Sequence, residues 1–114
     1  MENAALSFDQ VQINFCEASN AGGGIYLDGT HDVHKLQISS LSIYGCSATG
    51  AVSHGGGIFL DDSCTALDLS GRLVLTSNTA ALGGAIYVDQ HASIKSCDGC
   101  KILNNFATNS GGAL

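Results

Sequence analysis

Gly22-Gly23-Gly24-Ile25-Tyr26-Leu27-Asp28 is a seven-residue segment that returns twice more in this chain with small changes. It reads GGGIFLD at residues 55–61 and GGAIYVD at residues 83–89, and the chain stops inside a fourth copy, GGAL, at residues 111–114. Successive copies start 33, 28 and 28 residues apart. Self-similarity at periods of this length is typical of solenoids, in which each repeat is a small unit that packs against its neighbours.

A second element precedes each glycine segment. In it, an aliphatic residue is followed three positions later by cysteine or asparagine, and alanine follows two positions after that. The four copies begin at Ile13, Ile43, Leu75 and Ile102. A third element of alternating apolar residues comes before these in the first three repeats. The period of two is typical of strands, and no segment of useful length has helical spacing.

These elements predict an all-β chain folded as a right-handed parallel β-helix, with three short strands in each coil. The handedness rests on the general rule for parallel connections. We expect one β-helix segment over residues 1–114, with about three and a half coils, from a longer protein. The expected repeats cover approximately residues 6–35, 36–66, 67–95 and 96–114.

Stacked coils would align equivalent side chains in ladders about 4.8 Å apart. Two aliphatic ladders are predicted to face the interior: Ile25, Ile58, Ile86 and Leu114, and Ile13, Ile43, Leu75 and Ile102. Paired glycines are predicted at corners, where they permit positive φ or close backbone approach. These glycines are Gly22, Gly23, Gly55, Gly56, Gly83, Gly84, Gly111 and Gly112. Asn78 and Asn105 would stack in a turn and hydrogen-bond from coil to coil.

The chain has five cysteines, so at least one thiol is unpaired or is paired between chains. Cys16 and Cys46 occupy the same position in the first two repeats. We favour the interpretation that they fill the core as small apolar residues. A disulfide between them stays open as an alternative, because stacked coils bring equivalent Cα atoms within disulfide range.

The glycine and aliphatic-x-x-Asn motifs together resemble the repeats of chlamydial polymorphic membrane proteins, which are marked by GGA followed by Ile, Leu or Val and by FxxN. The best match is Leu75 to Ala80 leading into Gly83-Gly84-Ala85-Ile86. Aliphatic residues stand here at the position of the family's Phe. The resemblance implies an extracellular β-helix used in adhesion.

Composition excludes several classes of function. Charged residues make up 12% of the chain, and the formal net charge is −6. The four basic residues are scattered, whereas nucleic acids and polyanions require a clustered basic patch. No apolar run is long enough to span a bilayer. We therefore expect no nucleic-acid partner and no membrane insertion by this segment.

Asp28, Asp61 and Asp89 each end a glycine segment. If these aspartates stack, their like charges repel one another unless water or a cation such as calcium lies between them. Aspartate is also a good turn former, and we favour that interpretation over a metal site.

Other candidate ligands lack the spacing of a metal site. His31, Cys64 and His91 follow the three aspartates in loops of unequal length, and residues 97–100 form a single CxxC. No serine or cysteine nucleophile has a recognisable base partner. We expect no catalytic residue, no metal and no cofactor.

The resulting hypothesis is a non-catalytic structural or adhesive module, located outside the cell or at its surface, whose rigid rod contacts a protein or a cell-surface glycan. One alternative is a filament subunit that self-associates through open coil ends. A second alternative is a carbohydrate-active β-helix enzyme, which would require paired carboxylates in a cleft.

Overall fold

The computed structural model describes residues 5–27, 35–38, 40–60, 67–68, 72–89, 94–96 and 99–113. Within these residues every regular element is a β-strand. The same residues contain no helix that is long and apolar enough to cross a membrane.

The strands fall into four repeats. The first repeat contains β1 (Ala5–Phe8), β2 (Val11–Asn14), β3 (Glu17–Ala18) and β4 (Ile25–Leu27). The second contains β5 (Lys35–Ile38), β6 (Ser40–Tyr44), β7 (Ser47–Ala48) and β8 (Ile58–Leu60). The third contains β9 (Leu67–Asp68), β10 (Arg72–Thr76), β11 (Thr79–Leu82) and β12 (Ile86–Val88). The fourth contains β13 (Ile94–Ser96), β14 (Cys100–Leu103) and β15 (Phe106–Ser110).

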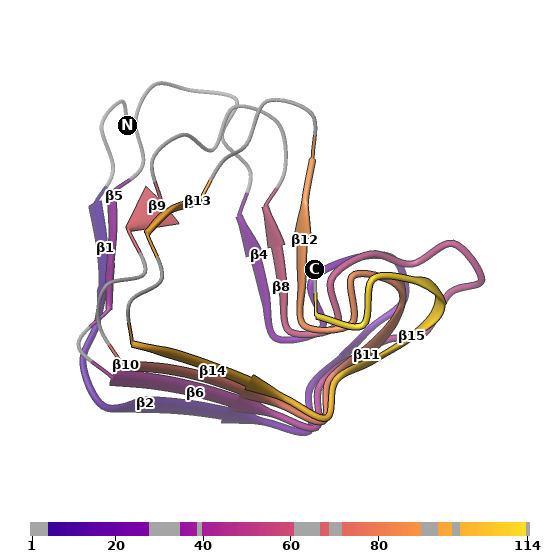
Figure 1. Ribbon diagram of the computed structural model, residues 1–114, viewed down its shortest axis with the longest axis horizontal. Helices are drawn as coiled ribbons and strands as arrows, with labels where there is room; N and C mark the ends of the chain where they lie inside the picture. The colour runs from indigo at the N-terminus through magenta and orange to yellow at the C-terminus, as the bar shows by residue number, and fades with distance from the viewer. Residues whose placement is uncertain are drawn as a thin grey trace.

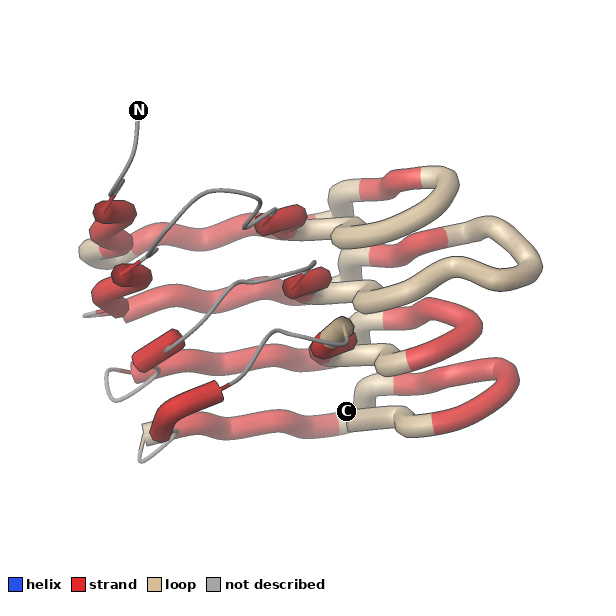
Figure 2. The backbone as a smooth tube through the Cα atoms, turned by 90° about the horizontal axis from the view of Figure 1, so that it is seen from above, coloured by secondary structure: helices blue, strands red, loops and turns tan. Residues whose placement is uncertain are grey.

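Strands at equivalent places in successive repeats pair in parallel. The sheet orders are β14-β10-β6-β2, β15-β11-β7-β3 and β12-β8-β4, with two further pairs, β1-β5 and β13-β9. Figure 1 looks along the stack, and Figure 2 shows the four repeats lying one above another. The prediction of an all-β chain built from parallel strands is confirmed.

The number of strands in a repeat differs from the prediction. The first three repeats contain four strands each, not three. The additional strands are β3, β7 and β11, which pair with one another and with β15. β3 and β7 have only two residues each, which is too short for an alternating pattern, so their strand character comes from backbone pairing with neighbouring repeats.

Aliphatic ladders form the core. Ile43 pairs in register with Ile13 on one side and with Leu75 on the other, and Leu75 pairs with Ile102. The predicted register of this ladder is therefore confirmed, as is that of Ile25, Ile58 and Ile86. Leu114 lies outside the described residues. The ladder residues of the second and third repeats are fully buried. Each such Leu or Ile stabilises the fold by roughly 1.5–3 kcal/mol relative to an exposed side chain.

The two glycines of each pair have different roles. The first glycine has a positive φ in every repeat, with values of 61°, 64°, 60° and 70° at Gly22, Gly55, Gly83 and Gly111. The second glycine allows two backbones to approach closely. A Cβ atom on Gly56 would overlap the carbonyl oxygens of Gly84 and Thr79.

A second corner follows the β2-β6-β10-β14 sheet. Its residues are Phe15, Gly45, Ser77 and Asn104, and all four have φ between 55° and 65°. Three of the four are not glycine, although this left-handed region favours glycine. Hydrogen bonds between repeats hold the corner: the N–H of Phe15 donates to the carbonyl of Tyr44 at 2.9 Å, and that of Gly45 donates to Thr76 at 3.0 Å.

Candidate functional site

The side-chain amides of Asn78 and Asn105 form a hydrogen-bonded ladder beside this corner. Asn78 is fully buried, and its Oδ1 accepts a hydrogen bond from the backbone N–H of Cys46 at 2.9 Å. The Asn78 Nδ2 donates to the carbonyl oxygen of Ile43 at 3.0 Å and to Asn105 Oδ1 at 2.9 Å. Asn105 Nδ2 in turn donates to the carbonyl of Leu75 at 2.9 Å. Each amide therefore links its own repeat to the preceding one.

Cys46 continues this ladder with a single sulfur atom. Its Sγ accepts a hydrogen bond from the N–H of Cys16 at 3.4 Å, and the carbonyl oxygens of Ile13 and Tyr44 each lie 3.7 Å from that sulfur. These contacts match those of Asn78, because Ile13 occupies in the first repeat the position that Ile43 occupies in the second. The one thiol therefore takes the place of both the oxygen acceptor and the nitrogen donor of an asparagine amide. Burial raises the pKa of the Cys46 thiol, and the N–H of Cys16 acts in the opposite direction.

Cys16 and Cys46 are both free cysteines, so the structure does not contain the disulfide between them that the sequence left open. Cys46 is buried and uses its sulfur in the ladder, whereas Cys16 is exposed. Cys100 is disulfide-bonded. Cys64 and Cys97 lie outside the described residues.

Only one of the three candidate aspartates is described. Asp89 is partly buried at the end of β12, where its N–H donates to the carbonyl oxygen of Leu60 at 2.9 Å. Asp28 and Asp61 lie outside the described residues, as do His31 and His91. Within the described part of the chain, no group of three or more His, Cys, Asp or Glu side chains is placed to hold a metal ion.

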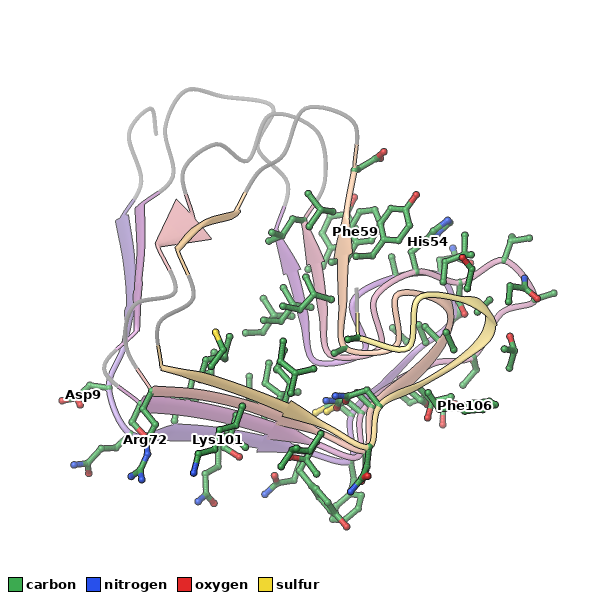
Figure 3. All side chains as sticks on the ribbon, in the orientation of Figure 1. Asp9, His54, Phe59, Arg72, Lys101 and Phe106 are labelled. Carbon is green, nitrogen blue, oxygen red and sulfur yellow. The ribbon has the colours of Figure 1, made fainter. Side chains whose placement is uncertain are left out.

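An aromatic ladder runs along the face of β4, β8 and β12 that is opposite the core. The rings of Tyr26 and Phe59 stack with centroids 5.1 Å apart, and those of Phe59 and Tyr87 stack at 5.3 Å. His54 packs edge-on against Tyr87 at 4.5 Å and against Phe59 at 5.8 Å (Figure 3). Because the ring faces are stacked on one another, this ladder binds the repeats together, while Tyr26 at its end stays 48% exposed.

Sequence reasoning missed this ladder, although the signal was present. Tyr26, Phe59 and Tyr87 occupy the same position of the glycine segment and lie in register. No repeated motif pointed to His54 as a member of this ladder. His54 lies just before Gly55, in the long segment of the second repeat, outside the repeated glycine segment.

A polar hollow of about 670 Å³ lies on the outer face of the β2-β6-β10 strands. We call it the outer hollow. Two serines of β6, Ser40 and Ser42, lie between longer side chains of β2 and β10. The lining residues are Gln10, Val11, Gln12, Ser40, Ser42 and Arg72. The hollow therefore exists because the second repeat carries short side chains where its neighbours carry long ones.

Large apolar side chains are exposed near the second corner. Phe15 is 73% exposed and packs edge-on against Tyr44, with ring centroids 5.2 Å apart. In the fourth repeat, Leu103 and Phe106 are exposed to 54% and 61%. These side chains leave apolar surface exposed on either side of this corner, at the ends of β2 and β14 and in β15.

No protein-family model, no curated protein and no solved structure matches the chain.

Proposed function

We propose that this chain is a segment of a right-handed parallel β-helix that acts as a non-catalytic structural and adhesive rod at the cell surface or outside the cell. The observation that supports this most strongly is the repeated register of inward and outward side chains. Ile43 and Leu75 continue one inward ladder, while Gln12 and Ser42 continue the outward row beside it. A frame of this kind holds surface side chains at fixed spacings.

The handedness follows the general rule for parallel crossovers, and the resemblance to chlamydial polymorphic membrane protein repeats supports the same architecture. In this architecture each repeat is one coil, and the outward rows run along the length of the rod.

A structural role is supported by how the buried polar groups are used. Asn78, Asn105 and Cys46 all hydrogen-bond between repeats. Among the described residues, every buried side-chain nitrogen and oxygen atom has a partner. These groups thus stabilise the stack.

An extracellular location is supported by the disulfide at Cys100, because disulfides form and persist in oxidising compartments. An adhesive role is supported by the outer surface, which carries a polar hollow and exposed aromatic side chains such as Phe15 and Phe106. Exposed aromatic residues are enriched where protein surfaces make contacts.

Self-assembly into filaments is the second candidate. In the β14-β10-β6-β2 sheet, β2 and β14 each have one neighbouring strand, and the inward residues Ile13 and Ile102 are only partly buried. Stacking of one copy on another would pair β14 with β2 and bury both residues.

Adhesion of coated beads tests the proposal. Beads that carry the folded chain should be retained on cultured cells and on glycan-coated surfaces well above beads that carry the urea-unfolded, alkylated chain at equal density. Equal retention of the two bead types would contradict an adhesive role. Light scattering over a concentration series, with electron microscopy of the same samples, separates the filament alternative: rods that lengthen with concentration favour it.

A further inference from the structure

The outer hollow combines a rigid floor with polar walls. Its floor consists of the β2, β6 and β10 backbones, whose opposite face carries the buried residues Leu41, Ile43 and Leu75. Because these inward residues are close-packed, the outward residues of the same strands are held at fixed positions. The site is therefore largely formed before any ligand arrives, which lowers the entropy cost of binding.

Strand register explains the arrangement of the polar groups. Ser40 pairs with Arg72, and Gln12 pairs with Ser42. Gln10 directly precedes β2 and lines the same hollow. The β2 and β10 strands lie about 10 Å apart, on either side of β6. Two glutamines thus stand on one side of the serines and one arginine on the other.

Gln10 lies at the corner that directly precedes β2. Its φ of 56° is like those of Phe15, Ser77 and Asn104 at the second corner, so this backbone conformation belongs to the turn between strands. Gln12, the other glutamine of the hollow, lies two residues further along, in β2.

The chemistry of the lining points to one kind of ligand. Amide and hydroxyl groups both donate and accept hydrogen bonds, which matches the hydroxyl groups of a sugar. Arg72 is exposed, forms no ion pair with another described residue, and has the planar fork that binds a carboxylate through two parallel hydrogen bonds. A single arginine on a chain of net charge −6 suits one carboxylate and does not suit a polyanion.

We propose that the outer hollow binds a saccharide that carries one carboxylate, with the carboxylate on Arg72 and the sugar hydroxyls on Gln12, Ser40 and Ser42. This inference rests on the proposed adhesive function and names the chemical class of its partner. A cell-surface glycan that ends in one acidic sugar has this chemistry.

Titration calorimetry and saturation-transfer NMR with the whole chain test the site, with sialyllactose and lactose as probes. Sialyllactose should bind more tightly than lactose, and Arg72→Gln should lower the affinity for sialyllactose at least about tenfold while leaving lactose unchanged. Ser42→Gln should weaken binding of both sugars because it fills the hollow. The fold should accept this substitution, since Gln12 occupies the equivalent position in the first repeat.

Lys101→Gln is the matched control. Lys101 is exposed on the same face of the sheet, and it does not line the hollow (Figure 3). Its substitution removes the same charge and should change the affinity less than about twofold. Equal losses in the Lys101→Gln and Arg72→Gln variants would overturn the proposal, because they would reflect charge alone. Acetate binding as tight as that of sialyllactose would overturn the saccharide assignment.

The bead assay distinguishes failure of this site from failure of the adhesive function. If beads with the Arg72→Gln chain adhere as well as wild type and sialyllactose does not bind, the site is wrong and the adhesive function stands. If wild-type beads do not adhere and sialyllactose does not bind, both are wrong. Unfolding curves of the variants, expected to match wild type because Arg72 is exposed, show that binding losses are not folding losses.

Discussion

Asn78 and Cys46 lie in adjacent repeats, and the Asn78 side chain accepts the hydrogen bond of the Cys46 backbone N–H at 2.9 Å. The same position in the next repeat holds Asn105, whose Oδ1 accepts from the Asn78 N–H at 2.9 Å. This side-chain position therefore satisfies, repeat after repeat, the backbone donor that follows the second corner. Buried donors without a partner are costly, so the position couples the stability of neighbouring repeats.

Asn78→Ala should lower the free energy of unfolding by about 2–4 kcal/mol, because the Cys46 N–H and the Ile43 carbonyl would both lose a buried partner. Urea denaturation measures this change. Asn109→Ala makes the same substitution at an exposed position and should stay within about 0.5 kcal/mol of wild type. Equal effects of the two substitutions would contradict the ladder.

Cys46→Asn should keep or raise the stability, because an amide at this position can bond with the N–H of Cys16 and the carbonyl of Ile13. Gly57 packs against Asn78 as Gly24 packs against Cys46, so the site has room for asparagine. Cys46→Ala should cost about 1–2 kcal/mol, because it leaves both groups unpaired. Thermal unfolding of the two variants side by side checks the expectation, and a lower midpoint for Cys46→Asn than for Cys46→Ala would count against it.

The stability should fall at alkaline pH because burial raises the pKa of Cys46 above the ordinary thiol value of 9.0. The unfolded chain then loses this proton at a lower pH than the folded chain does. The free energy of unfolding should be unaffected by Cys46 up to about pH 8 and should decrease from about pH 9 until the folded thiol also ionises. Tyrosine and lysine titrate in every variant, so the difference between wild type and Cys46→Asn isolates the thiol. If the free energy of unfolding changes with pH in the same way in the two proteins, the Cys46 thiol is not the source of the alkaline loss of stability.

Gly56→Ala should destabilise the chain by at least about 2–3 kcal/mol, because the new methyl group would overlap the carbonyl oxygens of Gly84 and Thr79. Gly112 holds the same position in the fourth repeat, and a Cβ atom there would lie 3.1 Å from the nearest atom, the carbonyl oxygen of Asn105. Gly112→Ala should therefore cost less than about 1 kcal/mol. Chemical denaturation of both variants measures the two losses of unfolding free energy. Equal losses would mean that replacing glycine, and not close packing between repeats, causes the destabilisation.

The aliphatic ladders could be predicted from sequence because they repeat at a fixed period. Ile43 and Leu75 belong to alternating patterns that recur in each repeat, and the structure pairs them in register. A parallel stack brings equivalent positions together, so finding the repeat was enough to find these pairs.

The second corner could not be predicted in the same way. Phe15, Gly45, Ser77 and Asn104 share a left-handed backbone but no side-chain type. Their conformation is imposed by hydrogen bonds between repeats, such as that from the Gly45 N–H to the Thr76 carbonyl. Local sequence carries no sign of a constraint that comes from the neighbouring repeat. The short strands β3 and β7 were missed for the same reason.

The outer hollow also depends on differences between repeats. Ser42 lies beside Gln12 on one strand and beside Val74 on the other. A search for shared motifs ignores positions that vary, yet the variation creates the concave surface. Such a site becomes visible only after the repeats are aligned in space.

Methyl NOE spectroscopy of the folded chain tests the stacked register most directly. The account predicts strong contacts from the Ile43 methyl groups to those of Ile13 and Leu75, and from Leu75 to Ile102, although these residues are about 30 positions apart in the chain. Absence of these contacts would contradict the parallel stack on which the ladder, the outer hollow and the proposed function depend. Stronger contacts from Ile43 to Leu73 than to Leu75 would contradict its register.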